Sequence, residues 1–398
     1  MKKLILGALM VSATAQANIK ILQAQLDAHS LEVKNLKQQI YLLTDDNAAK
    51  LPAFLSWRNK NANFKLYGAL NQAMLYADDG YSSNLFAVTN EIYNSRVGIL
   101  GSFTADNDPK IGGNIEFGLK INPSYLVSQN TSTVNDPIDV RNAEVFITSE
   151  KYGSVYLGRG ATSSFNSARV ELANPTNILD SGVNFIGGGL YFRSTGTSAD
   201  YTSDNQINSI FNLINGYGRV NRFLYNTPKF YGFSLSGSVV DAKSRDAGLW
   251  YNQNFKYLNA AGAIGITTPK TQNDVTGKFL DGSLSLLFNS GIFTTFSAGE
   301  IFVKNNPARQ TPYYGYVKTG YQTKIFSPGL TIFGVDCSQN NNYVMNDDKG
   351  RSYAFAVAQN FDKFDLSIYA GDRVYTLKRI GATFSNINAI TTGAFFKF

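Results

Sequence analysis

Apolar and polar residues alternate along most of the chain beyond Pro52. Between residues 111 and 121 the odd positions are mainly apolar, whereas the even positions include Glu116 and Lys120. A period of two predicts β-strands with one apolar face. Sixteen such segments follow one another: 64–77, 92–104, 111–123, 138–149, 152–161, 219–227, 229–241, 247–257, 259–268, 277–289, 291–304, 312–325, 329–340, 350–361, 363–376 and 386–398.

The connections between these segments alternate in length. Tight turns such as Tyr152-Gly153 and Ser290-Gly291 are followed by longer polar loops such as 122–137 and 339–350. Short turns at one end and long loops at the other are typical of an up-and-down barrel. Glu116 and Lys120 cannot face lipid cheaply, so we expect them to face water or protein inside the barrel. The pattern predicts an all-β, 16-stranded antiparallel transmembrane β-barrel.

The last segment, Ile390 to Phe398, carries much of this interpretation. Phe398, Phe396 and Ile390 fall on one face of the expected strand. Chain ends in water usually fray, so a terminal Phe gains little there. At a membrane interface an aromatic side chain is favoured. We therefore expect Phe398 to mark the barrel terminus at such an interface; an ordinary sandwich strand is the alternative.

One connection is far longer than the others. Residues 162–218 separate two strands and contain Glu171, Asp180 and the run Gly187-Gly188-Gly189. A long loop on an otherwise economical scaffold is often functional. A barrel of about sixteen strands encloses an open channel unless something narrows it. The segment is therefore expected to fold inward, with an extracellular flap as the alternative.

Composition agrees with alternation. The chain has 28 Phe, 23 Tyr and only 16% charged residues, yet its mean hydropathy is -0.16. Such a chain must scatter its apolar residues, since blocks of them would raise the mean. Beyond residue 63 there are 28 Lys/Arg against 25 Asp/Glu, which gives no argument for nucleic acid as a partner. The single cysteine, Cys337, cannot form an intrachain disulfide.

The first 63 residues follow different patterns. Residues 1–17 have two lysines, an apolar run and small residues, which predict an export signal peptide cleaved after Ala17. Residues 18–46 predict a periplasmic coiled coil, and 47–63 a linker to the barrel at 64–398. The heptad seam implies oligomerisation, because a lone helix of this length is marginal in water. Its a and d positions are Ile19, Leu22, Leu26, His29, Val33, Leu36, Ile40 and Leu43.

The number of helices in this coiled coil is left open by its a and d residues. His29, the one polar seam residue, is either a register or anion-binding device or a tolerated core imperfection. A single helix packed on its own domain is the alternative for the whole segment. We expect the segment to form a stalk that binds the cell wall or another periplasmic protein.

Three stretches resemble a known family. Phe64-Lys65-Leu66-Tyr67-Gly68-Ala69, Asn94-Ser95-Arg96-Val97-Gly98 and Tyr152-Gly153-Ser154-Val155-Tyr156-Leu157-Gly158-Arg159 are similar to the opening strands of the general trimeric porins of Gram-negative outer membranes. Gly187 to Arg193 and Tyr225 to Phe233 are similar to the constriction loop and following strands of proteobacterial members. The resemblance covers about residues 64–398.

This resemblance implies homotrimers and a third loop folded into the pore against basic wall residues. By position, the basic wall would be Arg96, Arg141, Arg219, Arg222 and Arg159, and the loop acids would be Glu171 and Asp180. Opposed charges across a narrow gap would order water and filter solutes. Some of these arginines could instead pair with carboxylates in the wall. Ala69 stands where many relatives carry a basic residue, and the heptad segment lies outside the minimal porin pattern.

The expected function is passive diffusion of small hydrophilic solutes and ions through an outer-membrane channel. Outer-membrane lipid and lipopolysaccharide are the expected surroundings, with no cofactor and no metal. A solute-specific channel for sugars or for phosphate and other anions is the closest alternative. The only histidine is His29, so a Ser-His or Asp-His catalytic site in the barrel is excluded by inventory. An adhesin or structural tether would require a plugged lumen.

Overall fold

The computed structural model describes residues 56–58, 61–105, 108–195, 203–241, 244–268, 277–303 and 308–398. All of them belong to one compact unit, Ala48–Phe398. The predicted signal peptide and heptad seam lie outside the described residues, and so do most residues of the linker. In the described ranges, no helix is both long and apolar enough to cross a membrane.

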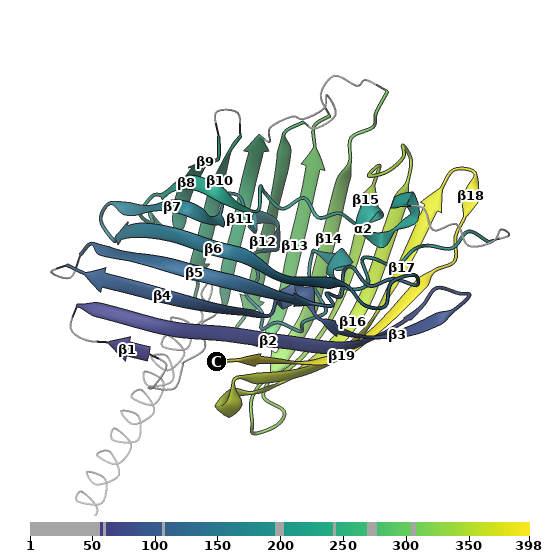
Figure 1. Cartoon of the computed structure of the whole chain (residues 1–398), viewed down its shortest axis with the longest axis horizontal. Helices are drawn as coiled ribbons and strands as arrows, with labels where there is room; N and C mark the ends of the chain where they lie inside the picture. The colour runs from purple at the N-terminus through teal and green to yellow at the C-terminus, as the bar shows by residue number, and fades with distance from the viewer. Residues whose placement is uncertain are drawn as a thin grey trace, which may run out of the picture. The chain divides into compact units, whose positions relative to one another are not determined.

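Sixteen antiparallel strands form a closed wall, which confirms the predicted fold class. Each expected segment overlaps one of them, in the same order. Figure 1 shows the wall curling around until the last strand lies beside the first. The strands are β2 (Ala62–Asp78), β4 (Arg96–Thr104), β5 (Lys110–Ile121), β6 (Asn135–Ser149), β7 (Gly153–Ala161), β8 (Arg219–Asn226), β9 (Phe233–Val239), β10 (Arg245–Asn254), β11 (Leu258–Thr268), β12 (Phe279–Phe288), β13 (Ile292–Ile301), β14 (Tyr313–Thr323), β15 (Thr331–Asn341), β16 (Lys349–Phe361), β17 (Leu366–Arg379) and β19 (Ile387–Lys397).

The C-terminal residue completes the closure. Strand β19 pairs with β2 up to Lys397 and Ala69. Beyond that pair, the Phe398 amide donates to the Gly68 carbonyl at 3.0 Å, and the Gly68 amide donates to the Phe398 carbonyl at 2.8 Å. A barrel has no unpaired strand edge once this seam is closed. Phe398 therefore holds the first strand to the last.

The alternation seen in the sequence becomes the two faces of the wall. On β5, Ile115 and Phe117 are 50% and 39% exposed on the outer face, whereas Glu116 between them is 3% exposed inside. The outer face of the described strands carries most of the large exposed apolar side chains. Such an outer surface suits hydrocarbon, and the polar inner face suits water or protein.

Several short elements were not expected from the sequence. These are β1 (Ser56–Arg58), β3 (Ser83–Thr89), β18 (Ala382–Thr383), the helix α2 (Ile207–Ile210) and the 3-10 turns η1 (Glu91–Tyr93), η2 (Ser167–Arg169), η3 (Val183–Phe185), η4 (Ser203–Asn205) and η5 (Asp362–Phe364). The strand expected at 92–104 begins at Arg96 instead. Asn90 accepts the Ile92 amide and caps η1, which keeps residues 91–93 out of the strand.

Candidate functional site

Arg96, Arg141 and Glu116 meet on the inner face of the wall. Arg141 Nε donates to Glu116 Oε1 at 2.5 Å, and Arg96 Nε lies 3.9 Å from Glu116 Oε2. All three side chains are less than 10% exposed. A β-bulge positions Arg141, because Glu116 pairs with Asn142 while the next residue of β5 pairs with Val140. The extra residue is free of the ladder and turns inward.

The same network reaches the 3-10 turn η1. Arg141 Nη1 donates to Asn94 Oδ1 at 3.0 Å, and Asn94 Nδ2 donates to Glu91. Burial raises the pKa of Glu91 to about 7, although the nearby charges of Lys120 and Arg141 oppose that rise. Glu91 is therefore a carboxylic acid that changes charge near neutral pH beside the arginine pair.

Arg222 pairs with a different wall carboxylate. Its Nη2 donates to Glu144 Oε2 at 2.5 Å, and its other nitrogens donate to the carbonyls of Ala161 and Gly158 at 2.8 and 3.0 Å. Gly160 leaves room for the pair, since a Cβ there would lie within 3 Å of both side chains. Arg222 is thus held by protein groups on the inner face between β6 and β8.

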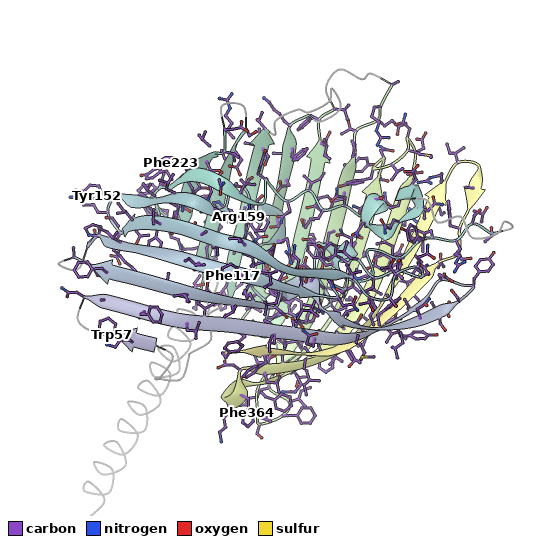
Figure 2. The ribbon with its side chains drawn as sticks, viewed as in Figure 1. Trp57, Phe117, Tyr152, Arg159, Phe223 and Phe364 are labelled. Atoms are coloured by element: carbon purple, nitrogen blue, oxygen red, sulfur yellow. The ribbon has the colours of Figure 1, made fainter. Side chains whose placement is uncertain are left out.

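Two of the five predicted wall arginines lie away from this cluster. Arg159 alternates with Gly158 and Gly160, which face inward, and shares the outer side with Leu157. Figure 2 labels it on the stretch of wall that also carries Phe117 and Phe223. Arg219 shares its strand alternation with the outward Phe223, and its guanidinium lies 4.6 Å from the Phe165 ring centroid. Residues an even number of positions apart on a strand share a face, so Arg159 falls on the face of Leu157 and Arg219 on the face of Phe223. Neither residue joins the Arg96 and Arg141 cluster.

Backbone amides at the start of the 162–218 segment bind the inner wall in succession. The Ser164 amide donates to Asp246 on β10 at 2.8 Å. The amides of Val170 and Leu172 donate to Ser283 and Ser285 on β12 at 2.9 and 3.1 Å. The segment therefore crosses the inner face from strand to strand, and wall side chains satisfy its otherwise unpaired amides.

The middle of the segment is held through its carbonyls. Tyr375 on β17 donates to the carbonyls of Val183 and Ile186 at 2.7 and 2.5 Å. Arg373, also on β17, donates to the Ile178 carbonyl at 2.9 Å while pairing with Asp336 of β15 at 2.7 Å. These contacts tie the segment to the far side of the wall from its start.

Apolar burial adds to the polar contacts. The segment has its own set of buried apolar side chains, and Tyr375, Phe293 and Leu75 of the inner wall are each 0% exposed. The Phe211 and Tyr375 rings stand edge to face at 5.3 Å. The buried apolar residues of the segment are Ala168, Leu172, Ala173, Ile178, Leu179, Val183, Ile186, Leu190, Phe192, Ile207, Ile210, Phe211 and Ile214. Burial of this extent favours one fixed position over a mobile flap.

The two predicted loop acids each have a cation beside them. Glu171 pairs with Lys318 of β14 and also accepts from Thr295. Asp180 pairs at 2.8 Å with Arg169 of its own segment, and Arg169 also donates to the Ile92 carbonyl at 3.0 Å. Each acid is thus paired with a nearby cation, and neither forms an ion pair with one of the five predicted wall arginines in the described structure.

Sequence reasoning missed three basic residues of this site, Lys318, Arg373 and Arg169. A signal for the first two was present, because Lys318 and Arg373 fall on the inward alternation of strands that were predicted correctly. Arg169 had no such signal, since it lies in an irregular segment whose path depends on tertiary contacts.

The geometry defines a closed β-barrel with an apolar outer face and a charged inner face, the architecture of an outer-membrane channel. Residues 9–379 match the model of the Gram-negative porin family, and the chain belongs to that family. It is an outer-membrane protein. No curated protein sequence matches the chain.

Solved structures share the fold at low sequence identity. An anion-selective porin from Comamonas acidovorans is 15% identical, with a TM-score of 0.58 over 85% of this chain and 100% of that one. OmpT, an outer membrane protein of Vibrio cholerae, is 15% identical, with a TM-score of 0.54 over 88% and 100%. Salmonella typhi OmpF in complex with daunomycin is 12% identical, with a TM-score of 0.54 over 86% and 100%.

Proposed function

We propose that the protein is a diffusion channel for small hydrophilic solutes and ions, narrowed by the 162–218 segment. The observation that carries this is the attachment of the segment to inner-facing side chains of β10, β12, β14 and β17. A chain held across the inner wall reduces the open cross-section while leaving a water-lined passage. The channel function also fits the porin family better than a catalytic one.

Weak ion selectivity follows from the pairing of charges. Arg141 and Arg96 share Glu116, Arg222 has Glu144, Lys318 has Glu171, and Arg169 has Asp180. Local compensation of this kind lowers the field across the passage, so ions of both signs would pass.

Planar bilayer recordings test the channel. Single-channel conductance should rise linearly with salt concentration, and micromolar sugar or polyphosphate should not block it. Saturating conductance with block by one of these solutes would replace the general channel by the solute-specific alternative. A reconstituted protein without conductance would remove the transport function altogether.

The functional unit is proposed to be a homotrimer. One of the OmpT structures of Vibrio cholerae is described as a trimer form. The predicted heptad seam of this chain would bury its apolar positions only against partner helices. The seam would form a periplasmic stalk. Unheated protein in mild detergent should migrate as a trimer, and a variant lacking residues 18–46 should keep the barrel trimer but lose a helical signal in circular dichroism.

The outer face also suggests how the protein meets outer-leaflet lipid. Lys349 and Lys378 are direct cross-strand partners, and exposed Arg351 lies two residues from Lys349. Like charges in direct opposition destabilise a ladder. Phosphate groups of lipopolysaccharide would relieve that repulsion. Replacing all three by Gln should reduce the lipopolysaccharide that copurifies, as measured by mass spectrometry.

A further inference from the structure

Two opposite charges lie on the outer face of the barrel, within the expected apolar band. Arg159 is six residues from Gly153, where β7 leaves its short turn, and Asp372 is six residues from Leu366, where β17 leaves its own. Six residues span about 20 Å along a strand. A strand tilt of roughly 35–45° places both residues about 15 Å above the periplasmic end, within an apolar band about 25 Å tall.

Arg159 has apolar neighbours on this face. Leu157 precedes it by two positions and pairs with Phe223 of β8, and these two side chains are 57% and 50% exposed. The direct partner of Arg159 on β8 is Asn221. Arg159 Nε donates at 2.5 Å to the carbonyl of Val140, the residue before the bulged Arg141 of β6. This bond uses one of five N–H donors of the guanidinium. Within the described part of the chain the guanidinium makes no other hydrogen bond, so most of its donors remain for another partner.

Asp372 lies in a shallow outer groove lined by Cys337, Tyr353, Phe355 and Val374. Its neighbours Gly371 and Arg373 point inward, toward Ile178 of the segment, so the carboxylate points outward. Its Oδ1 atom is buried without a hydrogen-bond partner among the described residues, and the Arg373 backbone amide also faces the carboxylate. A carboxylate in this position is costly against lipid.

We infer that Arg159 of one subunit pairs with Asp372 of the next around the trimer. The inference rests on the proposed homotrimer. A cyclic trimer joins two different patches of each subunit, so a positive patch and a negative patch complete each other three times. Each charged side chain then contacts a side chain of opposite charge at the same depth in the membrane, where it would otherwise contact lipid.

The order of the strands agrees with this arrangement. The wall runs β17, β19, β2, β4, β5, β6, β7, which places β4 midway between the two charges. The symmetry axis would therefore face β4. Gly101 of β4 and Gly113 of β5 are direct partners on the outer face, in a groove bordered by Ile99 and Ile115. An added Cβ at Gly101 would meet nothing within 4 Å, so nothing in the described part of its own subunit demands a small residue there.

Charge exchange tests the pair. Arg159→Asp and Asp372→Arg should each lower the temperature at which the trimer dissociates in detergent, because each places like charges together. The double variant should regain most of the lost stability. Equal dissociation temperatures for the wild type and all three variants would overturn the inference.

Cross-linking tests the proximity directly, in a Cys337→Ser background because Cys337 lies beside Asp372. Full-length protein carrying both Arg159→Cys and Asp372→Cys should give covalent trimers with a short bismaleimide, and either single variant should give none. A trimeric protein without cross-linked products would place the interface elsewhere. A monomeric protein that conducts would overturn the Arg159–Asp372 pair and support the channel function. A cross-linked trimer without conductance would support the pair and overturn the channel function.

Discussion

Glu91 shows how burial at one residue couples the channel to pH. It is 4% exposed, and its surroundings include Asn94, Lys120, Arg141 and Asp139. Desolvation outweighs the two cations, so the protonated form is favoured until the pH approaches 7. Because the pKa in the folded protein is raised, the stability from protonated Glu91 is present below about 4.5 and is lost as pH rises through about 7.

The Glu91→Gln variant should therefore lose a pH step. In the wild type, ionisation between about pH 6 and 8 adds a negative charge beside Arg141 and moves the reversal potential toward cation preference. It also costs on the order of 3 kcal/mol of stability at alkaline pH. Reversal potentials and heat-dependent gel mobility, measured from pH 5 to 9, should be flatter in the variant. An unchanged pH profile would show that Glu91 does not titrate in this range.

Arg141 offers a second test at this scale. Arg141→Ala leaves Glu116 with Arg96 at 3.9 Å and with the Tyr67 hydroxyl as remaining partners. The lumen then gains net negative charge, and the reversal potential should shift toward cation preference. Lys363→Ala removes a cation from an exposed turn and should leave the potential unchanged. Equal shifts of the reversal potential in both variants would mean that ion preference depends on net charge and not on the position of Arg141.

At the level of elements, strands were predictable and the long segment was not. Alternation found all sixteen wall strands because each has one apolar and one polar face. It missed β3, which pairs only with residues 72–78 at the C-terminal end of β2. The path of residues 162–218 depends on partners more than 50 residues away, such as Tyr375 and Asp246, and no local period encodes them. For the same reason, the placement of Arg159 and Arg219 required the register of their strands.

Removing one tie of the segment should change the passage without unfolding the barrel. Tyr375→Phe deletes the hydroxyl that bonds the Val183 and Ile186 carbonyls, a loss of about 1–3 kcal/mol that the strand ladder does not share. The segment should fluctuate more, so single-channel records should show added noise or a larger conductance. Tyr353→Phe alters an exposed outer tyrosine and serves as the control. Identical records for the three proteins would separate the segment from the conductance.

For the molecule as a whole, closure of the wall is the decisive step, because every strand edge is satisfied only when β19 meets β2. Gly68 lies at that seam, and an added Cβ there would overlap the Phe398 ring and approach the Arg96 carbonyl at 2.9 Å. Gly68→Leu should therefore destabilise the closed barrel by roughly 1–3 kcal/mol or more. Gly315→Leu, on the outer face of β14 with nothing within 4 Å of its Cβ, should be tolerated. The midpoint temperature for loss of the compact gel form measures both. A Gly68→Leu barrel as heat-resistant as the Gly315→Leu barrel would show that the C-terminal ring can move aside and that tight packing at the seam is dispensable.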